Sequence, residues 1–361
     1  MKKHYNILYL CLEFDKWNLA RPWTYQSNLG IEEGFSSNNL TFLTVTTPWL
    51  GQIRELCREC TFDQVWVEIV HQNISEDLFD WLKTISRVRI GLIFESLTNL
   101  EEQSVDNKLL NERYIRVREK LKYLSHVISV DEIDAKNIAL EFGIPTFWWP
   151  SCMPERYVKI LKTNNKINKA VFSGTLYGLR VNLIKEAQLE NLVVFQSSPD
   201  RNNFYHFVFD FIHIFRSFIT YALPKLNKLN YCLYILILRI SRRKNYSIYL
   251  NSISQYSIVL NLPSIVKAYP GRVTEAMSVG SVVISNLISD RPQNQILFED
   301  KKEILIYNSE NIREFISSIK FILKNDELRR KISNNAFNCI KKSHTVEIRV
   351  SQVLEWLSLQ E

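Results

Sequence analysis

The chain of 361 residues contains no long low-complexity tract, which argues against a disordered or fibrous protein. Apolar residues make up 46 % of it and aromatic residues 12 %, enough for sizeable hydrophobic cores. Because the length is about two to three times that of a usual domain, we expect a folded protein of two domains.

Cysteine is scarce and scattered. The pair in Cys57-Arg-Glu-Cys60 has neither a second pair nor a histidine at metal-ligand spacing, so two thiols on one helix are favoured over zinc. The apolar run at the N-terminus is closed by Asp15 and Lys16, too early for a secretory signal peptide. We therefore expect a reducing, cytoplasmic location.

Excess charge is modest, since the formal net charge is only +7. A charge of this size suits an anionic small ligand or a membrane surface at least as well as a nucleic acid.

The first half of the sequence alternates short apolar runs with helical patterns. This alternation predicts an α/β fold with a parallel, doubly wound sheet, so residues 1–150 are interpreted as a Rossmann-like domain. Asp131 and Gly143 are expected to cap and to stop the helix before the last strand. The predicted strands are 6–12, 40–46, 65–70, 89–94, 126–130 and 145–149.

After a connector at 151–168, the same pattern starts again and predicts a second Rossmann-like domain over 169–343. A final helix is expected over 344–361. Two such domains in tandem predict a cleft between the carboxyl edges of their sheets, where a ligand is expected. The predicted strands of the second domain begin at 169 and continue with 192–196, 257–260, 281–285 and 304–307.

Residues 204–244 interrupt the second domain with a strongly apolar and aromatic insertion that contains one acidic residue, Asp210, and ends in the basic run Arg239 to Lys244. Neither of its apolar runs is an uninterrupted span of about 20 residues, so a transmembrane helix is disfavoured. Two interpretations remain: a helical pair lying on an anionic membrane surface, or a hairpin packed on the parent domain or on a second copy of the chain. Nucleic acid is disfavoured, because the basic residues alternate with aliphatic ones.

Two short stretches of the second domain have the pattern of an anion site. In Phe172-Ser173-Gly174-Thr175 a strand runs into a helix through glycine, and Arg180 follows at the helix start. In AYPGRVTEAMSVGSVVISN, residues 268–286, a short helix carries Arg272 and Glu275, with Glu275 expected in its first turn. A carboxylate there accepts two ribose hydroxyls, or it merely complements the helix dipole.

Three segments, RVTEAMSVGSVVIS, LFEDKKEILIYNS and the C-terminal KNDELRRKISNNAFNCIKKSHTVEIRVSQVLEWL, together resemble the C-terminal domain of GT-B glycosyltransferases. The resemblance is to the group-1 type and its spore-maturation-protein-like branch. It implies that Glu275 binds the ribose of a nucleotide-sugar donor and that Gly174 and Arg180 face the diphosphate, with Arg272 beside them. Lys267 stands where many retaining members have a second glutamate, so the stereochemistry is left open; its ammonium would help to neutralise the diphosphate.

Sugar transfer needs a stabilised leaving group and, in an inverting enzyme, a base. The resemblance implies that basic side chains and helix termini stabilise the leaving group without a metal. No Asp-x-Asp pair ends a strand, so we expect no metal and no cofactor besides the donor. A base is expected at the carboxyl ends of the first-domain strands, and the candidate is His71. Glu95 and Asp15 are alternatives, and so is an enzyme that has no base.

The leading hypothesis is a metal-independent glycosyltransferase of polysaccharide biosynthesis that uses a nucleotide-diphosphate sugar. Its acceptor would be a cell-surface glycan or a lipid-linked molecule at the inner face of the membrane. The alternatives are a non-catalytic sugar-nucleotide or glycan-binding subunit of a membrane complex, and a glycosyltransferase that acts on protein or DNA.

Overall fold

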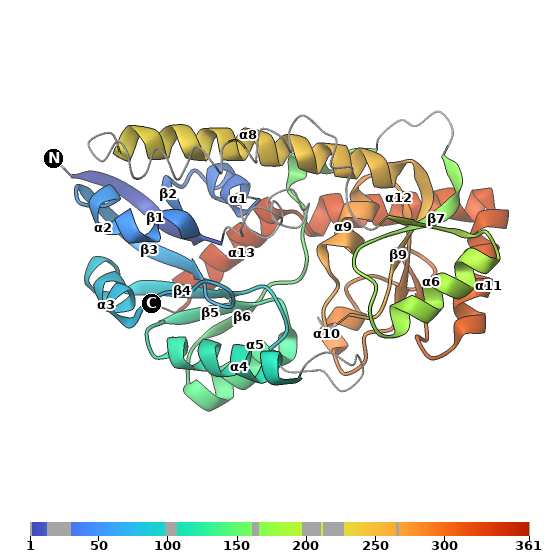
Figure 1. Ribbon diagram of the computed structural model, residues 1–361, viewed down its shortest axis with the longest axis horizontal. Coiled ribbons are helices and arrows are strands. Elements are labelled where there is room, and N and C mark those ends of the chain that lie inside the picture. Colours follow the sequence, from blue (N-terminus) through green and yellow to red (C-terminus); the bar gives the residue numbers. More distant parts are fainter. Residues whose placement is uncertain are drawn as a thin grey trace.

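The computed structural model describes residues 2–12, 30–97, 107–160, 166–196, 227–264 and 267–360, and residue 211 between them. The candidate base Asp15 and nearly all of the first half of the insertion, 204–226, lie outside the described residues. The chain forms two α/β domains side by side, each built on one parallel sheet (Figure 1). The prediction of two Rossmann-like domains is confirmed.

The first sheet has six parallel strands in the order β2-β1-β3-β4-β5-β6. Each of the six predicted runs forms a strand. Fully buried Ile and Leu in β1 and β4 suit a sheet that helices cover on both faces. The strands are β1 (Lys3–Cys11), β2 (Phe42–Thr46), β3 (Cys60–Glu68), β4 (Val88–Ile93), β5 (His126–Ser129) and β6 (Thr146–Trp148).

Local capping residues fix the helices of this domain. Asp131 accepts a hydrogen bond from the Ile133 amide at 2.9 Å, and Gly143 ends the helix with a φ of 64°, both as predicted. Cys57 and Cys60 do not share a helix, because α2 ends at Leu56 and β3 begins at Cys60. The helices are α1 (Ile31–Ser37), η2 (Thr47–Gln52), α2 (Ile53–Leu56), α3 (Glu76–Ile85), α4 (Asn107–Leu121) and α5 (Glu132–Phe142).

The second sheet has five parallel strands in the order β11-β10-β9-β7-β8, and each again matches a predicted run. The strands are β7 (Ile167–Ser173), β8 (Val193–Gln196), β9 (Tyr256–Asn261), β10 (Val282–Asn286) and β11 (Leu305–Tyr307). The helices that follow the connector helix η3 (Glu155–Tyr157) are α6 (Leu179–Leu189), α8 (Asn227–Ser254), α9 (Gly271–Ser278), α10 (Pro292–Gln295), α11 (Ile312–Lys324), α12 (Asp326–Ser343) and α13 (Val346–Ser358).

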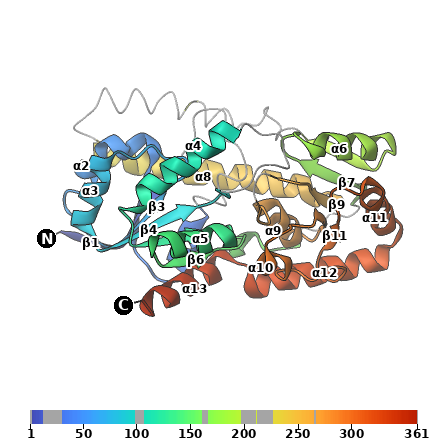
Figure 2. The same cartoon turned by 90° about the horizontal axis from the view of Figure 1, so that it is seen from below.

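The C-terminal helix α13 crosses back to the first domain (Figure 2). Its Trp356 ring packs on His126 of β5 and Phe147 of β6, with ring centroids 5.4 and 5.5 Å apart. Thr345 caps this helix by accepting from the Ile348 amide at 3.3 Å. The crossing ties the end of the chain to the domain with which it began.

The long helix α8, the second half of the insertion, runs along both domains (Figure 1). At its start Tyr231 packs on Trp49 of the first domain, with ring centroids 5.3 Å apart, and it ends directly before β9 of the second. It extends ten residues beyond Lys244, the end assigned to the insertion from sequence. No helix in the described ranges is long and apolar enough to cross a membrane.

Not all of the basic side chains of α8 point outward. Arg239 forms a bidentate pair with Glu32 of α1, with N···O distances of 2.6 and 2.7 Å, and Arg242 is only 3 % exposed. The inner face of α8 therefore packs on the parent domains, which is the second of the two interpretations of this segment.

Candidate active site

At the edge of the first sheet, the structure brings together two of the predicted catalytic residues. His71 follows β3 and Glu95 follows β4, and because these strands are adjacent and parallel, their carboxyl ends meet. His71 Nε2 lies 3.2 Å from Glu95 Oε1, and Arg113 Nη1 of α4 donates to Glu95 Oε2 at 2.6 Å. An imidazole in contact with a fixed carboxylate can move a proton, so this pair can serve acid–base chemistry.

The loop that carries His71 is held from two sides. The buried carboxylate of Glu68 accepts hydrogen bonds from the amides of Val70, His71 and Gln72 at 2.9 to 3.2 Å. Lys120 donates to the carbonyls of Ile69 and Gln72 at 2.6 and 2.7 Å. Glu68 thus occupies a strand position that sequence patterning reserves for an apolar residue, because its carboxylate orders the turn that presents His71.

The contacts of this pair shift both of its pKa values. Burial alone would lower the pKa of His71, but the hydrogen bond and charge of Glu95, helped by the charge of Glu68, raise it above its ordinary value. Burial would raise the pKa of Glu95, but the bond and charge of His71 and the charge of Arg113 lower it. The charged imidazolium–carboxylate pair is therefore favoured over the neutral one.

The edge of the second sheet presents an arginine with unused donors. Arg272, at the start of α9, places its guanidinium over the Phe172 ring, 4.8 Å from the ring centroid. A Cβ on Gly174 would lie 2.6 Å from Arg272 Nη2 and displace the guanidinium, and the φ of 155° at Gly174 favours glycine. Arg272 Nε and Nη1 are buried without a hydrogen-bond partner. Buried N–H groups in this state are suited to an anionic ligand.

Glu275 lies one turn further along α9 and is only 3 % exposed. The expectation that it lies in the first turn is wrong, since the helix begins at Gly271. Its Oε1 accepts from the Tyr246 hydroxyl and its Oε2 from the Tyr249 hydroxyl, both at 3.1 Å. Burial raises the pKa of Glu275 to about 7, although the two hydroxyls and Arg272 oppose the shift.

Arg180 has a different environment from the one its sequence position indicated. Its Nε donates to the Pro263 carbonyl at 2.6 Å and its Nη1 to the Thr175 carbonyl at 3.0 Å, and the guanidinium stacks on Tyr177. Burial lowers the pKa of Arg180 to about 10. With these donors used by the main chain, Arg180 holds the loops around the site; a direct contact with a diphosphate stays a prediction, and Arg272 has the freer donors.

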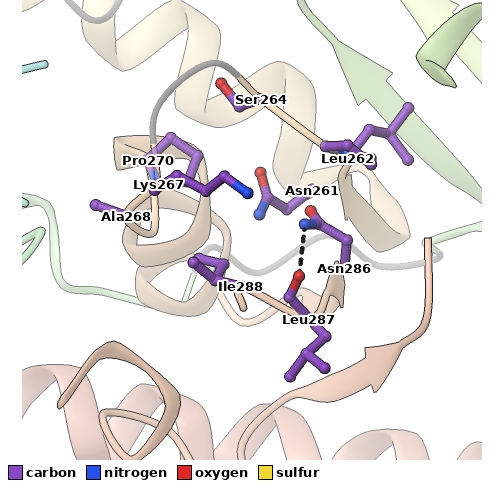
Figure 3. A pocket seen from close by; sticks show the side chains of 10 residues that line it. Asn261, Leu262, Ser264, Lys267, Ala268, Pro270, Asn286, Leu287 and Ile288 are labelled. Carbon is purple, nitrogen blue, oxygen red and sulfur yellow. Dashed lines mark hydrogen bonds between the residues drawn. The ribbon is translucent and has the colours of Figure 1, made fainter. Parts of the chain in front are cut away.

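Lys267 lies at the junction of the two domains. It lines a pocket at the carboxyl ends of β9 and β10, and in Figure 3 its ammonium and the amides of Asn261 and Asn286 point into the same hollow. The Lys267 amide donates to the Ser96 hydroxyl at 2.8 Å, and Ser96 is the residue after Glu95. The His71–Glu95 pair and the second-domain pocket therefore face the same interdomain space.

Sequence reasoning missed Tyr246, Tyr249 and Ser96. The two tyrosines lie on α8 beyond the segment that drew attention, and their spacing of three residues matches one helix face but no motif. Only the packing of α8 against α9 reveals their role. Of the predicted site residues, the structure groups His71 with Glu95, and Gly174 with Arg272 and Glu275.

Comparison with known proteins agrees with this architecture. Residues 231–355 match the family model described as "Glycosyl transferase-like". No curated protein sequence matches the chain.

Three of the solved structures that resemble the chain match it over nearly its whole length. Sucrose-phosphate synthase from Thermosynechococcus elongatus has a TM-score of 0.58 at 10 % identity, covering 99 % of this chain and 100 % of that one. HepE from Anabaena, in complex with UDP and glucose, has a TM-score of 0.56 at 11 % identity and coverages of 98 and 100 %. An alpha-glucosyltransferase in complex with UDP-glucose and DNA containing an abasic site has a TM-score of 0.61 at 10 % identity and coverages of 98 and 100 %.

Because the sequence identities are this low, these structural similarities establish the fold alone. The chain has the two-domain GT-B glycosyltransferase fold, and its second domain is glycosyltransferase-like in sequence.

Proposed function

We propose that the protein is a glycosyltransferase that moves a sugar from a nucleoside-diphosphate donor to an acceptor held on the first domain. One observation carries the proposal: the 2.8 Å contact between the Lys267 amide and the Ser96 hydroxyl joins the two sheet edges. On one side of it lies the His71–Glu95 pair, and on the other lies the pocket next to Arg272 and Glu275. Acid–base groups thus face an edge suited to an anion, as transfer from a diphosphate leaving group requires.

In this proposal each residue has one task. Arg272 and the amides near Gly174 bind the diphosphate, Glu275 accepts the ribose hydroxyls together with its tyrosines, and Lys267 adds positive charge beside the leaving group. His71 takes the proton of the acceptor hydroxyl, and Glu95 orients its imidazole and stabilises the imidazolium. The departing diphosphate is stabilised by these cations without a metal ion.

We further propose that the acceptor is a lipid-linked molecule or a cell-surface glycan under assembly at an anionic membrane. The outer face of α8 supports this, because Leu229, Leu233, Leu236 and Ile240 are 50 to 66 % exposed at steps of four, three and four residues. Exposed lysines flank this stripe at Lys228 and Lys244. An apolar stripe flanked by cations is typical of a helix that lies in a membrane interface.

The test is release of nucleoside diphosphate from a panel of UDP-, GDP-, ADP- and dTDP-sugars, with and without excess EDTA. We expect slow hydrolysis of at least one donor, unaffected by EDTA and strongly reduced in Arg272→Gln. Arg313→Gln removes an exposed arginine from α11 and serves as the matched control. Binding of a donor without any hydrolysis or transfer would favour the non-catalytic subunit, and activity that EDTA abolishes and Mn²⁺ restores would refute the metal-independent mechanism.

A further inference from the structure

The hollow beside Lys267 contains a buried polar atom that the proposed mechanism does not use. Asn261, the last residue of β9, lines this hollow and is only 2 % exposed. Its Oδ1 atom is buried without a hydrogen-bond partner in the part of the chain that the structure describes. In Figure 3 the Asn261 amide points into the same space as the side chains of Lys267 and Asn286. A buried acceptor in this state destabilises a fold, so its position on a hollow indicates a ligand that donates a hydrogen bond.

Neighbouring contacts fix which end of the Asn261 amide is left for a ligand. Asn261 Nδ2 donates to Ser285 Oγ of β10 at 2.8 Å, and Ser285 Oγ in turn donates to a main-chain carbonyl, that of Asn286, at 3.1 Å. Because the Ser285 proton is used there, Ser285 Oγ accepts from Asn261, which assigns the NH2 group of the amide to this contact. The amide oxygen is therefore the end that a ligand can use.

The hollow lies between the groups to which the proposed function assigns the transfer. Pro270 lines it and directly precedes α9, two residues before Arg272, the proposed diphosphate ligand. Lys267 also lines it, and its amide donates to Ser96, the residue after Glu95. In a nucleoside-diphosphate sugar, the sugar joins the leaving diphosphate to the atom that the acceptor attacks. The part of the donor expected at this hollow is therefore the transferred sugar.

Size and charge restrict which part of the sugar fits. The hollow has a volume of about 20 Å³, room for about one or two water-sized groups, so it admits a substituent of the sugar ring and not the ring itself. A hydroxyl can donate to Asn261 Oδ1 and accept from the Lys267 ammonium, which points into the same hollow. A carboxylate has no proton to donate to Asn261, and the charge of Lys267 would repel an ammonium group. A hydroxyl is thus the substituent that suits both side chains.

We infer that Asn261 determines donor specificity by accepting a hydrogen bond from one hydroxyl of the transferred sugar. The inference deepens the proposed function and rests on it for the identity of the ligand. Asn261 contributes to binding of the sugar, whereas Arg272 and Glu275 contribute to binding of the diphosphate and the ribose. This division of tasks can be measured, because a nucleoside diphosphate contains every part of the donor except the sugar.

The test compares each nucleotide sugar with its own nucleoside diphosphate by titration calorimetry on the intact chain. The probes are UDP-glucose, GDP-mannose, ADP-glucose and dTDP-glucose, with UDP, GDP, ADP and dTDP. For the donor that the wild type binds, Asn261→Leu should bind the nucleotide sugar about tenfold more weakly, because the sugar hydroxyl loses its acceptor. The same variant should bind the nucleoside diphosphate with unchanged affinity, which also shows that it is folded.

Two further variants control for packing. Asn335→Leu makes the same change at an asparagine of α12 that does not line the hollow, and it should leave both affinities unchanged. Asn261→Ser shortens the side chain, keeps a hydroxyl beside Ser285 and repeats the comparison should leucine disturb the packing. Equal losses of affinity for the nucleotide sugar and the nucleoside diphosphate in both Asn261 variants would overturn the inference, and so would wild-type affinity for both ligands.

Monodeoxy analogues of the bound sugar identify the hydroxyl. One analogue should bind the wild type about tenfold more weakly than the parent donor, and it should bind Asn261→Leu as well as the parent donor does, because the two changes remove the same hydrogen bond. Additive losses for every analogue would contradict a contact between Asn261 and a sugar hydroxyl.

Failure of this inference and failure of the proposed function give different results. A nucleotide sugar whose binding depends on Asn261, but which is neither hydrolysed nor transferred, would refute the function and support the inference. Turnover of a donor whose affinity is unaltered in Asn261→Leu would do the reverse. A chain that binds none of the four nucleotide sugars would refute both.

Discussion

Glu275 shows how one buried side chain can make the stability of the fold depend on pH. Its carboxylate is buried, accepts one hydroxyl on each oxygen, and has its pKa raised to about 7 by burial. The protein therefore maintains a carboxylate in a place where it destabilises the fold, which is common where a group serves a ligand.

This burial makes a prediction about stability and pH. With a pKa of about 7 in the folded state against 4.5 for the unperturbed group, Glu275 binds more protons when folded, so its contribution falls as pH rises from about 4.5 to 7. The free energy of unfolding of Glu275→Gln does not contain this pH-dependent decrease. Its stability relative to wild type should increase over that interval, by on the order of 3 kcal/mol, and then level off. Denaturant unfolding at a series of pH values measures the difference, and parallel curves for the two proteins would contradict the assignment.

The His71–Glu95 pair makes a prediction about rate and pH. If His71 is the base, it must lose its proton, so the transfer rate should rise with pH through the His71 pKa, which Glu95 raises. In Glu95→Gln this rise should move to lower pH while activity persists. Loss of activity at every pH in Glu95→Gln, with activity retained in His71→Gln, would instead identify Glu95 as the base.

At the scale of the element, α8 marks the limit of what the sequence could show. Capping residues such as Asp131 and Gly143 act locally, and the strands are short apolar runs, so both could be predicted correctly. Which face of α8 packs on the protein could not be predicted, because lipid and protein favour the same apolar side chains. The sequence also could not show that the donors of Arg180 are used by the main chain, because the Pro263 carbonyl that accepts from Arg180 lies 83 residues away in the chain.

The outer face of α8 carries the membrane prediction. Replacing Leu233 and Leu236 together by Gln removes two apolar side chains that are 50 and 53 % exposed, so sedimentation with anionic liposomes should fall markedly. Leu140 and Leu189, each 74 % exposed elsewhere on the molecule, form a matched control pair for the same substitution. Should the intact chain stay in the supernatant at low salt, the membrane proposal fails, and sedimentation velocity would then test whether the stripe joins two copies.

At the scale of the whole molecule, buried polar contacts join the domains. Arg291, before α10, pairs with Asp131, the cap of α5, at 2.7 and 3.0 Å, and the pair is almost fully buried. The next residue of α5, Glu132, accepts from the Gln293 and Asn294 amides at 3.1 and 2.8 Å. These contacts hold the two sheet edges at a fixed separation.

Breaking this pair should be costly because Asp131 would remain buried without its cation. We expect Arg291→Met to destabilise the protein by about 3 to 5 kcal/mol. Arg54→Met breaks an exposed pair with Asp77 and should cost less than about 1 kcal/mol. Equal melting temperatures for the two variants would show that the Arg291–Asp131 contact does not hold the domains together.

The most direct test of the central claim is the equilibrium binding of nucleoside diphosphates to the intact chain. The account predicts saturable binding of at least one of UDP, GDP, ADP and dTDP. It also predicts affinity about tenfold or more weaker in Arg272→Gln and unchanged in Arg313→Gln, because Arg272 has buried, unused donors beside Gly174 whereas Arg313 is exposed on α11. No binding of any of the four, or equal binding by Arg272→Gln, would contradict a donor site at the edge of the second sheet.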